Sequence, residues 1–246
     1  KGKKAPGKLK LSKQYQNFRY DTFNSLLIEF LKEAKCIDPP TVACLAVAGP
    51  VKNNRVALTN RQWIIDGSEL EEACGIRRVQ VVNDFLAQGY GLLTLDIEKE
   101  CVELHKSSRK QGGPIACIGA GTGLGECYLT AHAINNNDVN GSESESECEY
   151  VYQCFASEGG HAEFSPRNDV EYGLLKYLKE KYSKEGSCNR VSMERVVAGS
   201  GLPDVYEYLS IIFPKLIDPI IHDNINNGGD LKAAVIAQNK DINQLC

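Results

Sequence analysis

The sequence lacks any apolar run long enough to cross a bilayer, and its basic first residues lead us to expect no signal peptide. It also lacks an excess of positive charge, because 28 Lys and Arg against 32 Asp and Glu give a net charge of -4. The one basic cluster, Lys1 to Lys13, is interpreted as a solvated tail. We therefore expect a soluble protein that binds neither membrane nor nucleic acid.

No CxxC pair occurs among the ten cysteines, so a zinc site has little support. Most of the cysteines lie inside apolar runs, as Cys44, Cys117 and Cys154 do, which favours buried free thiols. Free thiols persist in a reducing compartment, so the predicted location is the cytoplasm.

Methionine is scarce as well. The only one is Met193, so the chain does not begin at an initiator residue, and we interpret it as a piece of a longer protein. Its 246 residues are 42% hydrophobic, which allows a substantial core in one large or two smaller domains.

Helix and strand patterns alternate over the first 95 residues, and this order is typical of an α/β fold. Asp21 is the predicted N-cap of the first helix, and Ser68 with Glu71 is predicted to form a capping box for the second. The run 41–49 is apolar without alternation, as expected for a strand of a parallel sheet that is covered on both faces. The expected elements are a helix over 21–34, a strand over 41–49, extended chain over 55–66, a helix over 68–75, and a strand and helix over 79–91.

After Leu95 the chain is polar as far as Gly113, which suggests a boundary between two domains. Residues 135–149 are an acidic, low-complexity insert whose composition cannot form a core, so this insert is predicted to be disordered. The remaining segments are predicted as strands over 115–118, 127–131 and 150–155, a helix over 170–182, a capped segment from Ser192, and helices in the final third.

Asn83 and Asp84 directly follow the apolar run Val79 to Val82, where a buried strand hands over to a helix. Ligands bind at the carboxyl edge of open α/β sheets, where an Asp can accept a proton and an Asn can both donate and accept hydrogen bonds. The alternative is ordinary helix capping, because both residue types are favoured N-caps. This stretch alone leaves both readings open.

The glycine-rich run GAGTGLG follows the strand 115–118 and is the strongest local signal. It matches neither the dinucleotide-binding GxGxxG pattern nor the Walker loop, and a strand rather than a helix is expected after it. The backbone amides and the Thr122 hydroxyl could bind phosphate oxygens in a glycine hairpin. A tight β-turn without a ligand is the alternative.

Glu158, His161 and Glu194 add carboxylates and an imidazole in glycine-rich or helix-start contexts. Together with the Asn83 amide they form an inventory suited to a sugar, because each hydroxyl can donate and accept a hydrogen bond. Taken singly, His161 fits an ordinary loop histidine, Glu158 a surface charge and Glu194 a first-turn residue favoured by the helix dipole.

Four motifs, VVNDF, GAGTGLG, SEGGHAEFSP and SMERVVAGSGL, occur in this order, with AVAGPV and VALTNRQW upstream. In combination the chain resembles the bacterial-type glucokinases of the sugar kinase, actin and heat-shock ATPase superfamily. The resemblance implies an actin-like (ribonuclease H-like) α/β fold, with two domains, 1–95 and 96–246, flanking a catalytic cleft. It also implies ATP-dependent phosphorylation of glucose at its 6-hydroxyl, with Mg²⁺ as the second cofactor.

The resemblance assigns roles residue by residue. Asp84 matches the catalytic base, and the glycine-run residues Gly121, Thr122 and Gly123 match the second phosphate loop. No residue is assigned as a metal ligand. The family commonly forms homodimers, and the oligomeric state of this chain stays open. The positions that match sugar-binding residues are Asn83, Asp84, Glu158, His161 and Glu194.

The chain departs from the family pattern at both ends. The phosphate-binding DxGGTN loop does not occur before Tyr15, and the sequence ends at Cys246, before the adenosine-binding segment of the family. Both departures affect the nucleotide side. Two hypotheses therefore stand: these residues are part of an active glucokinase, or they form a truncated, catalytically inert sugar-binding or regulatory protein. We expect little or no activity from the 246 residues alone.

Overall fold

The structure is a computed structural model that describes residues 8–35, 38–58, 62–108, 110–134, 149–184 and 190–246. Apart from Glu149, the acidic insert predicted to be disordered lies outside these residues. The chain divides into two compact units: Lys1–Ile115 with Tyr128–Ala156, and Ala116–Cys127 with Ser157–Cys246. This division differs from the boundary placed after Leu95, and the domains 1–95 and 96–246 stay a prediction.

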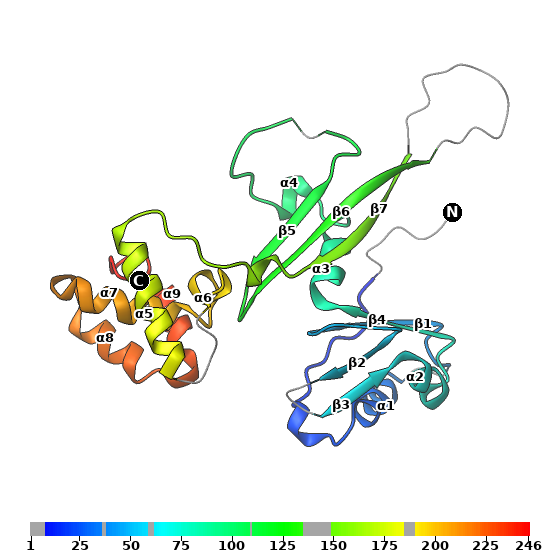
Figure 1. The fold of residues 1–246 in the computed structure, drawn as a ribbon. Helices are drawn as coiled ribbons and strands as arrows, with labels where there is room; N and C mark the ends of the chain where they lie inside the picture. Colours follow the sequence, from blue (N-terminus) through cyan, green and yellow to red (C-terminus); the bar gives the residue numbers. More distant parts are fainter. Residues whose placement is uncertain (1–7, 36–37, 59–61, 109, 135–148, 185–189) are drawn as a thin grey trace, which may run out of the picture. The chain divides into compact units, whose positions relative to one another are not determined.

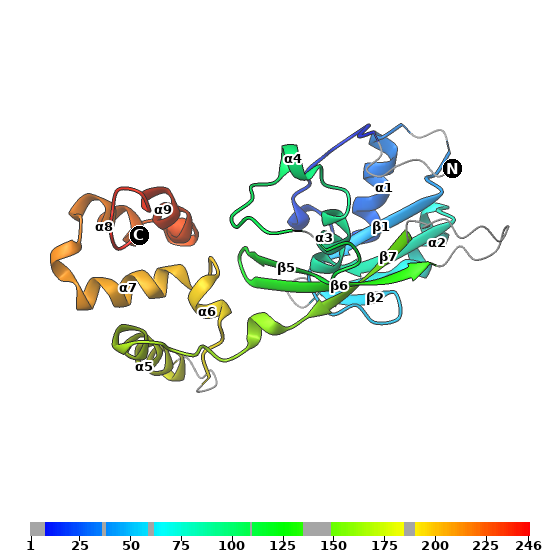
Figure 2. The same cartoon turned by 90° about the horizontal axis from the view of Figure 1, so that it is seen from above.

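The first unit has the predicted α/β order (Figures 1 and 2). Strands β1 and β4 pair in parallel, with Val47 opposite Asn83, and β2 and β3 pair as an antiparallel hairpin. Because parallel strands need a crossover connection, the β2–β3 hairpin and helix α2 lie between β1 and β4 in the chain. The elements are η1 (Asn17–Arg19), α1 (Phe23–Glu33), β1 (Val42–Val47), β2 (Arg55–Leu58), β3 (Trp63–Asp66), α2 (Gly67–Cys74), β4 (Arg78–Asn83), α3 (Asp84–Leu92) and α4 (Ile97–Glu100).

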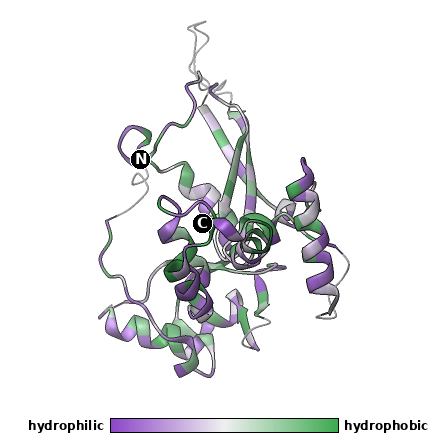
Figure 3. Cartoon of the chain, turned by 90° about the vertical axis from the view of Figure 1, so that its left-hand side faces the viewer, coloured by the Kyte–Doolittle hydropathy of each residue, from purple (hydrophilic) through white to green (hydrophobic). Residues whose placement is uncertain are grey.

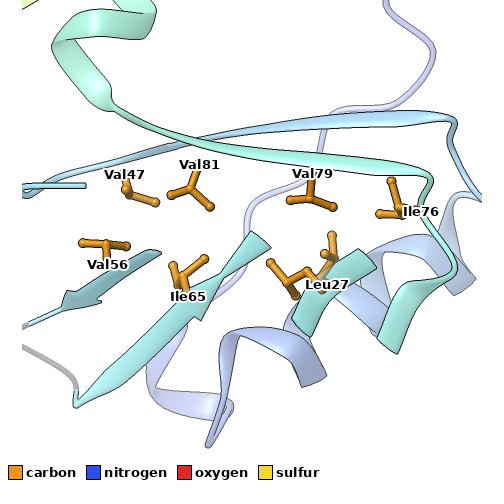
Figure 4. Close-up of a cluster of buried hydrophobic side chains, with 8 residues drawn as sticks. Leu27, Val47, Val56, Ile65, Ile76, Val79 and Val81 are labelled. Atoms are coloured by element: carbon orange, nitrogen blue, oxygen red, sulfur yellow. The ribbon is translucent and has the colours of Figure 1, made fainter. Parts of the chain in front are cut away.

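The core of the first unit lies between β4 and the β2–β3 hairpin. Val79 and Val81 of β4 point toward Val56 of β2 and Ile65 of β3 (Figure 4). Leu27 of α1 joins the same cluster. Alternate residues of β4 supply these side chains, as the period of two in a strand requires, so core packing fixes the register that delivers Asn83 and Asp84 to the end of the strand.

Two capping predictions were wrong. Thr22 rather than Asp21 caps α1, with Oγ1 accepting from Ser25 N at 3.2 Å. Helix α2 begins at Gly67, so Asp66 is its cap and accepts from Ser68 N at 2.9 Å. Glu71 cannot complete a capping box there, and its carboxylate instead accepts from Val79 N at 2.8 Å. Both helices keep an oxygen-bearing cap, at a position set by the backbone turn.

Strand β1 is covered on one face, not on both as predicted. Its burial alternates, with Val42 61% exposed and Val47 buried. Alternate side chains point to opposite faces of a strand. Ala43, Leu45 and Val47 face the buried cluster beside the hairpin, whereas Val42, Cys44 and Ala46 on the other face are exposed. The parallel pairing predicted from the run is confirmed.

Three strands, β5 (Ile115–Ala120), β6 (Leu124–Ile134) and β7 (Glu149–Ser157), form a sheet in that order and contribute residues to both units. Residues 121–123 connect β5 to β6. Only antiparallel neighbours can be joined by so short a connection. The strand predicted to follow the glycine run is therefore confirmed, and it extends beyond the expected 127–131.

The second unit is mainly helical after β7. Figure 3 shows both hydrophilic and hydrophobic residues along the helices, as expected where each helix buries one face. Tyr206 and Tyr208 of the long helix α7 belong to two different buried clusters, so α7 joins the packing of this unit. The elements are η2 (Gly159–His161), α5 (Asp169–Lys184), α6 (Glu194–Val197), α7 (Leu202–Ile212), η3 (Pro214–Leu216), α8 (Pro219–Asn226), η4 (Gly229–Leu231) and α9 (Lys232–Asn239).

The prediction of buried free thiols is confirmed for Cys154, which is buried, and is wrong for Cys44, which is exposed. Cys117 is partly buried and free, and burial raises the pKa of its thiol. Among the helices in the described ranges, none combines the length and apolar composition of a membrane span.

Candidate functional site

Asn83 and Asp84 lie where β4 ends and α3 begins, in the first unit. Asn83 Oδ1 caps α3 by accepting from Phe85 N at 3.0 Å and Leu86 N at 3.2 Å. Its Nδ2 donates to the carbonyl oxygen of Gly49 at 3.3 Å. The capping role weighed for this stretch is therefore present, and Asn83 also ties the loop after β1 to the end of β4.

Asp84 is half-buried and is the first residue of α3. Its Oδ1 accepts from its neighbour Phe85 N at 3.0 Å. Oδ2 has no hydrogen bond within the part of the chain that the structure describes. An ionised carboxylate can accept about four hydrogen bonds, so Asp84 keeps the capacity to accept a proton from a ligand.

The glycine hairpin, residues 121–123, lies in the second unit. Gly121 N donates to the carbonyl oxygen of Gly123 at 2.9 Å and closes the turn. The backbone N–H groups of Thr122 and Gly123 make no hydrogen bond with any residue that the structure describes. Two successive backbone donors in an exposed turn can bind an anion such as a phosphate group.

The segment 194–200 holds this hairpin from one side. Gly199 N donates to Gly121 O at 2.8 Å, and Ser200 N donates to Thr122 O at 3.1 Å. Glu194 Oε2 accepts from Leu124 N at 2.9 Å, across 70 positions of the sequence. Sequence reasoning placed Glu194 at a helix start, which is confirmed, but it did not predict this contact. Ser192 does not cap α6, whose N-cap position is Met193 without a side-chain hydrogen bond.

The loop that carries Glu158 and His161 is packed against the start of β6. A methyl group on Gly160 would lie 2.1 Å from the carbonyl oxygen of Leu124, so only glycine fits there. Glu158 Oε2 lies 3.5 Å from His161 Nε2, and their side chains are 84% and 57% exposed. Both are open to a ligand. Within the second unit, the structure thus brings together the glycine hairpin, this loop and Glu194.

Glu126 belongs to the same region, and sequence reasoning missed it. It is half-buried on β6, and an added Cβ on Gly159 would lie 2.0 Å from its Oε2. Its carboxylate therefore lies beside the backbone between Glu158 and Gly160. Glu126 lies only five positions after Gly121 in the sequence. The alternation of strand residues, however, gives no reason to choose Glu126 as a site residue.

Comparison with solved structures identifies the class of fold. A crystal structure of a glucokinase from an Antarctic psychrotroph aligns with 89% of this chain and 62% of its own, with a TM-score of 0.59 and 27% identity. The fold is the actin-like α/β fold predicted from the sequence motifs.

The family follows from the sequence comparisons. The profile of the glucokinase family matches residues 2–240, so the chain belongs to the glucokinase family. It is 38% identical over 195 residues to a glucokinase from Nostoc sp. and 40% identical over 191 residues to one from Synechocystis sp.. These alignments cover 79% and 76% of this chain but 51% and 48% of the relatives. The chain therefore spans about half the length of these relatives.

Proposed function

We propose that the protein is a glucokinase that transfers the γ-phosphoryl group of ATP to the 6-hydroxyl of glucose. Membership of the glucokinase family, with relatives at 38–40% identity, is the observation that carries this proposal. The local geometry supports it on both the sugar side and the phosphate side. In this proposal the enzyme works in the cytoplasm with glucose and ATP as partners, without membrane or nucleic acid, and a homodimer is the assembly to be tested.

In the proposed mechanism Asp84 is the general base. Its carboxylate accepts the proton of the 6-hydroxyl while the sugar oxygen bonds to the γ-phosphorus and the bond to the β-phosphate oxygen breaks, releasing ADP. A base of this kind contributes roughly 10²-fold to 10⁴-fold in rate. Asn83 fixes the start of α3, and with it the position of Asp84, through the two capping bonds.

We propose that Glu158, His161 and Glu194 hydrogen-bond sugar hydroxyls, as does Asn83. The exposure of Glu158 and His161 and the second oxygen of Glu194 support this assignment. Paired polar contacts of this kind discriminate between sugars, because a missing hydroxyl leaves a polar group of the protein unpaired. They do not by themselves distinguish glucose from its epimers.

We propose that Gly121, Thr122 and Gly123 bind phosphate oxygens of ATP. The two N–H groups of Thr122 and Gly123, which have no partner in the described chain, fit this role. Bound Mg²⁺ would neutralise charge that develops on the phosphate oxygens. Among the described residues no group of three or more His, Cys, Asp or Glu side chains could hold a metal, and we assign no protein ligand to Mg²⁺.

The test is ATP-dependent phosphorylation of glucose by the full-length protein, with mannose as a comparison sugar and the 246-residue chain in parallel. We expect turnover by the full-length protein and little or none by the 246 residues. A folded full-length protein that binds glucose but does not turn over ATP would refute the proposal and support the inert sugar-binding alternative.

A further inference from the structure

The two carboxylate oxygens of Glu194 have different surroundings. Its Oε2 is engaged by Leu124 N at 2.9 Å, at the point where the glycine hairpin passes into β6. Its Oε1 has no hydrogen bond within the described residues, and the side chain is only half-buried. One oxygen therefore holds the hairpin while the other is left for a sugar hydroxyl.

Within the described residues, three hydrogen bonds join segment 194–200 to residues 121–124, and only the bond to Leu124 uses a side chain. The other two bonds run from Gly199 N and Ser200 N to the carbonyl oxygens of Gly121 and Thr122. Loss of the carboxylate would leave the segment bonded to the hairpin only through Gly121 and Thr122. Gly123, whose N–H is a proposed phosphate donor, lies next to Leu124, where the bond to Glu194 would be lost.

We propose that Glu194 is a positioning residue for the phosphate hairpin as well as a sugar ligand, so that sugar binding and nucleotide binding are coupled through its carboxylate. This inference rests on the proposed function. A sugar hydroxyl that bonds to Oε1 restricts the Glu194 side chain in the rotamer that holds Leu124 N. Since coupling between two binding sites is reciprocal, a nucleotide bound at the hairpin must change the affinity for sugar by the same factor. A substitution in the hairpin that moves the Glu194 carboxylate should therefore also change the affinity for sugar.

The first test compares Glu194→Ala with Glu194→Gln in the full-length protein, using Mg²⁺-ADP as the probe in calorimetry. The Gln amide oxygen can still accept from Leu124 N, whereas Ala cannot. We expect Glu194→Ala to weaken Mg²⁺-ADP binding about 10-fold, the loss typical of one hydrogen bond to a charged group. Glu194→Gln should stay within about 2-fold of wild type, because its hydrogen bond to the hairpin is retained. Equal losses in both variants would overturn the proposal.

The second test changes a residue of the hairpin rather than Glu194. A methyl group on Gly123 would lie 2.6 Å from Glu194 Oε2, at the end of a flexible side chain that can move aside. Gly123→Ala should therefore displace the carboxylate without disturbing the fold. Gly91→Ala is the control, because its methyl group would meet no atom within 4 Å and Gly91 lies outside the phosphate hairpin.

Glucose binding is measured in the absence of nucleotide. We expect Gly123→Ala to weaken glucose binding about 10-fold and Gly91→Ala to leave glucose affinity unchanged. Equal glucose affinity in the two variants would overturn the coupling while leaving the proposed function intact. A wild-type protein that binds neither glucose nor Mg²⁺-ADP would overturn both.

Discussion

In the described structure β4 pairs with β1 along one edge, and the Asn54 side chain hydrogen-bonds to the backbone along its other edge. Its Nδ2 donates to Val79 O at 2.9 Å, and its Oδ1 accepts from Val81 N at 2.7 Å. Both valines are 1% exposed, so these backbone groups are screened from water. We predict that Asn54→Ala destabilises the first unit strongly, because both backbone groups lose their partner.

The magnitude follows from two contributions. Each lost hydrogen bond leaves a backbone group unsatisfied at about 1–1.5 kcal/mol, so the pair contributes about 2–3 kcal/mol. Asn54 also has φ +60°, and replacing Asn by Ala in the left-handed region adds about 1 kcal/mol. The expected loss in unfolding free energy is therefore about 3–4 kcal/mol. Asn53 has φ +52°, and its side chain makes no hydrogen bond to any residue that the structure describes, so Asn53→Ala should lose only about 1 kcal/mol.

The assay is urea unfolding followed by tryptophan fluorescence. Trp63 is the only tryptophan and lies buried on β3, so the signal reports the first unit. Both variants replace Asn by Ala at positive φ, so both carry the same backbone strain. The difference between their unfolding free energies therefore reports the hydrogen bonds of the Asn54 side-chain amide. Variants that differ by less than about 1 kcal/mol would refute the reasoning that the Asn54 amide satisfies the edge of β4.

Two further predictions concern the second unit. Burial, with a hydrogen bond to Asp204, raises the pKa of Tyr182 to about 12. The folded state therefore favours the neutral phenol. The stability that this preference contributes, up to about 3 kcal/mol, is present below pH 10 and is lost as pH rises to about 12. Tyr182→Phe should remove this fall from alkaline unfolding curves followed by circular dichroism, and an unchanged fall would contradict the assignment. Gly160→Ala should weaken glucose binding at least about 10-fold in calorimetry, because its methyl group meets the Leu124 carbonyl oxygen at 2.1 Å. The control Gly91→Ala meets no atom within 4 Å, and wild-type affinity in Gly160→Ala would count against the packing argument.

The local sequence predicted the order of helices and strands well where the periodicity of its apolar residues matches the side chains that are buried. The run Val79 to Val82 followed by Asn83 and Asp84 predicted the strand and the helix of the β4–α3 junction, and both are confirmed. Capping was left open as an alternative there, and the structure shows that Asn83 caps α3. The cap of α2 was missed because Asp66 and Ser68 are both favoured caps, and only the backbone turn selects between them. The prediction that both faces of β1 are covered was wrong because an apolar sequence does not show how many faces of a strand pack against other elements.

The convergence of the second unit's site could not be predicted from spacing. Glu194 and Leu124 are 70 positions apart, and their contact depends on how β6 and the segment after α5 pack. The motif resemblance selected Glu194 but not its bond to the hairpin. Glu126 carried no motif signal, and only the close approach of Gly159 shows that its carboxylate lies beside the loop that contains Glu158.

The most direct test of the account is the Asp84→Asn variant of the full-length protein, which keeps the side-chain shape and removes the base. We expect kcat for glucose phosphorylation to fall by roughly 10²-fold to 10⁴-fold while glucose affinity, measured separately by calorimetry, stays within about 3-fold of wild type. Retention of wild-type kcat in Asp84→Asn would contradict the central claim that this carboxylate takes the proton.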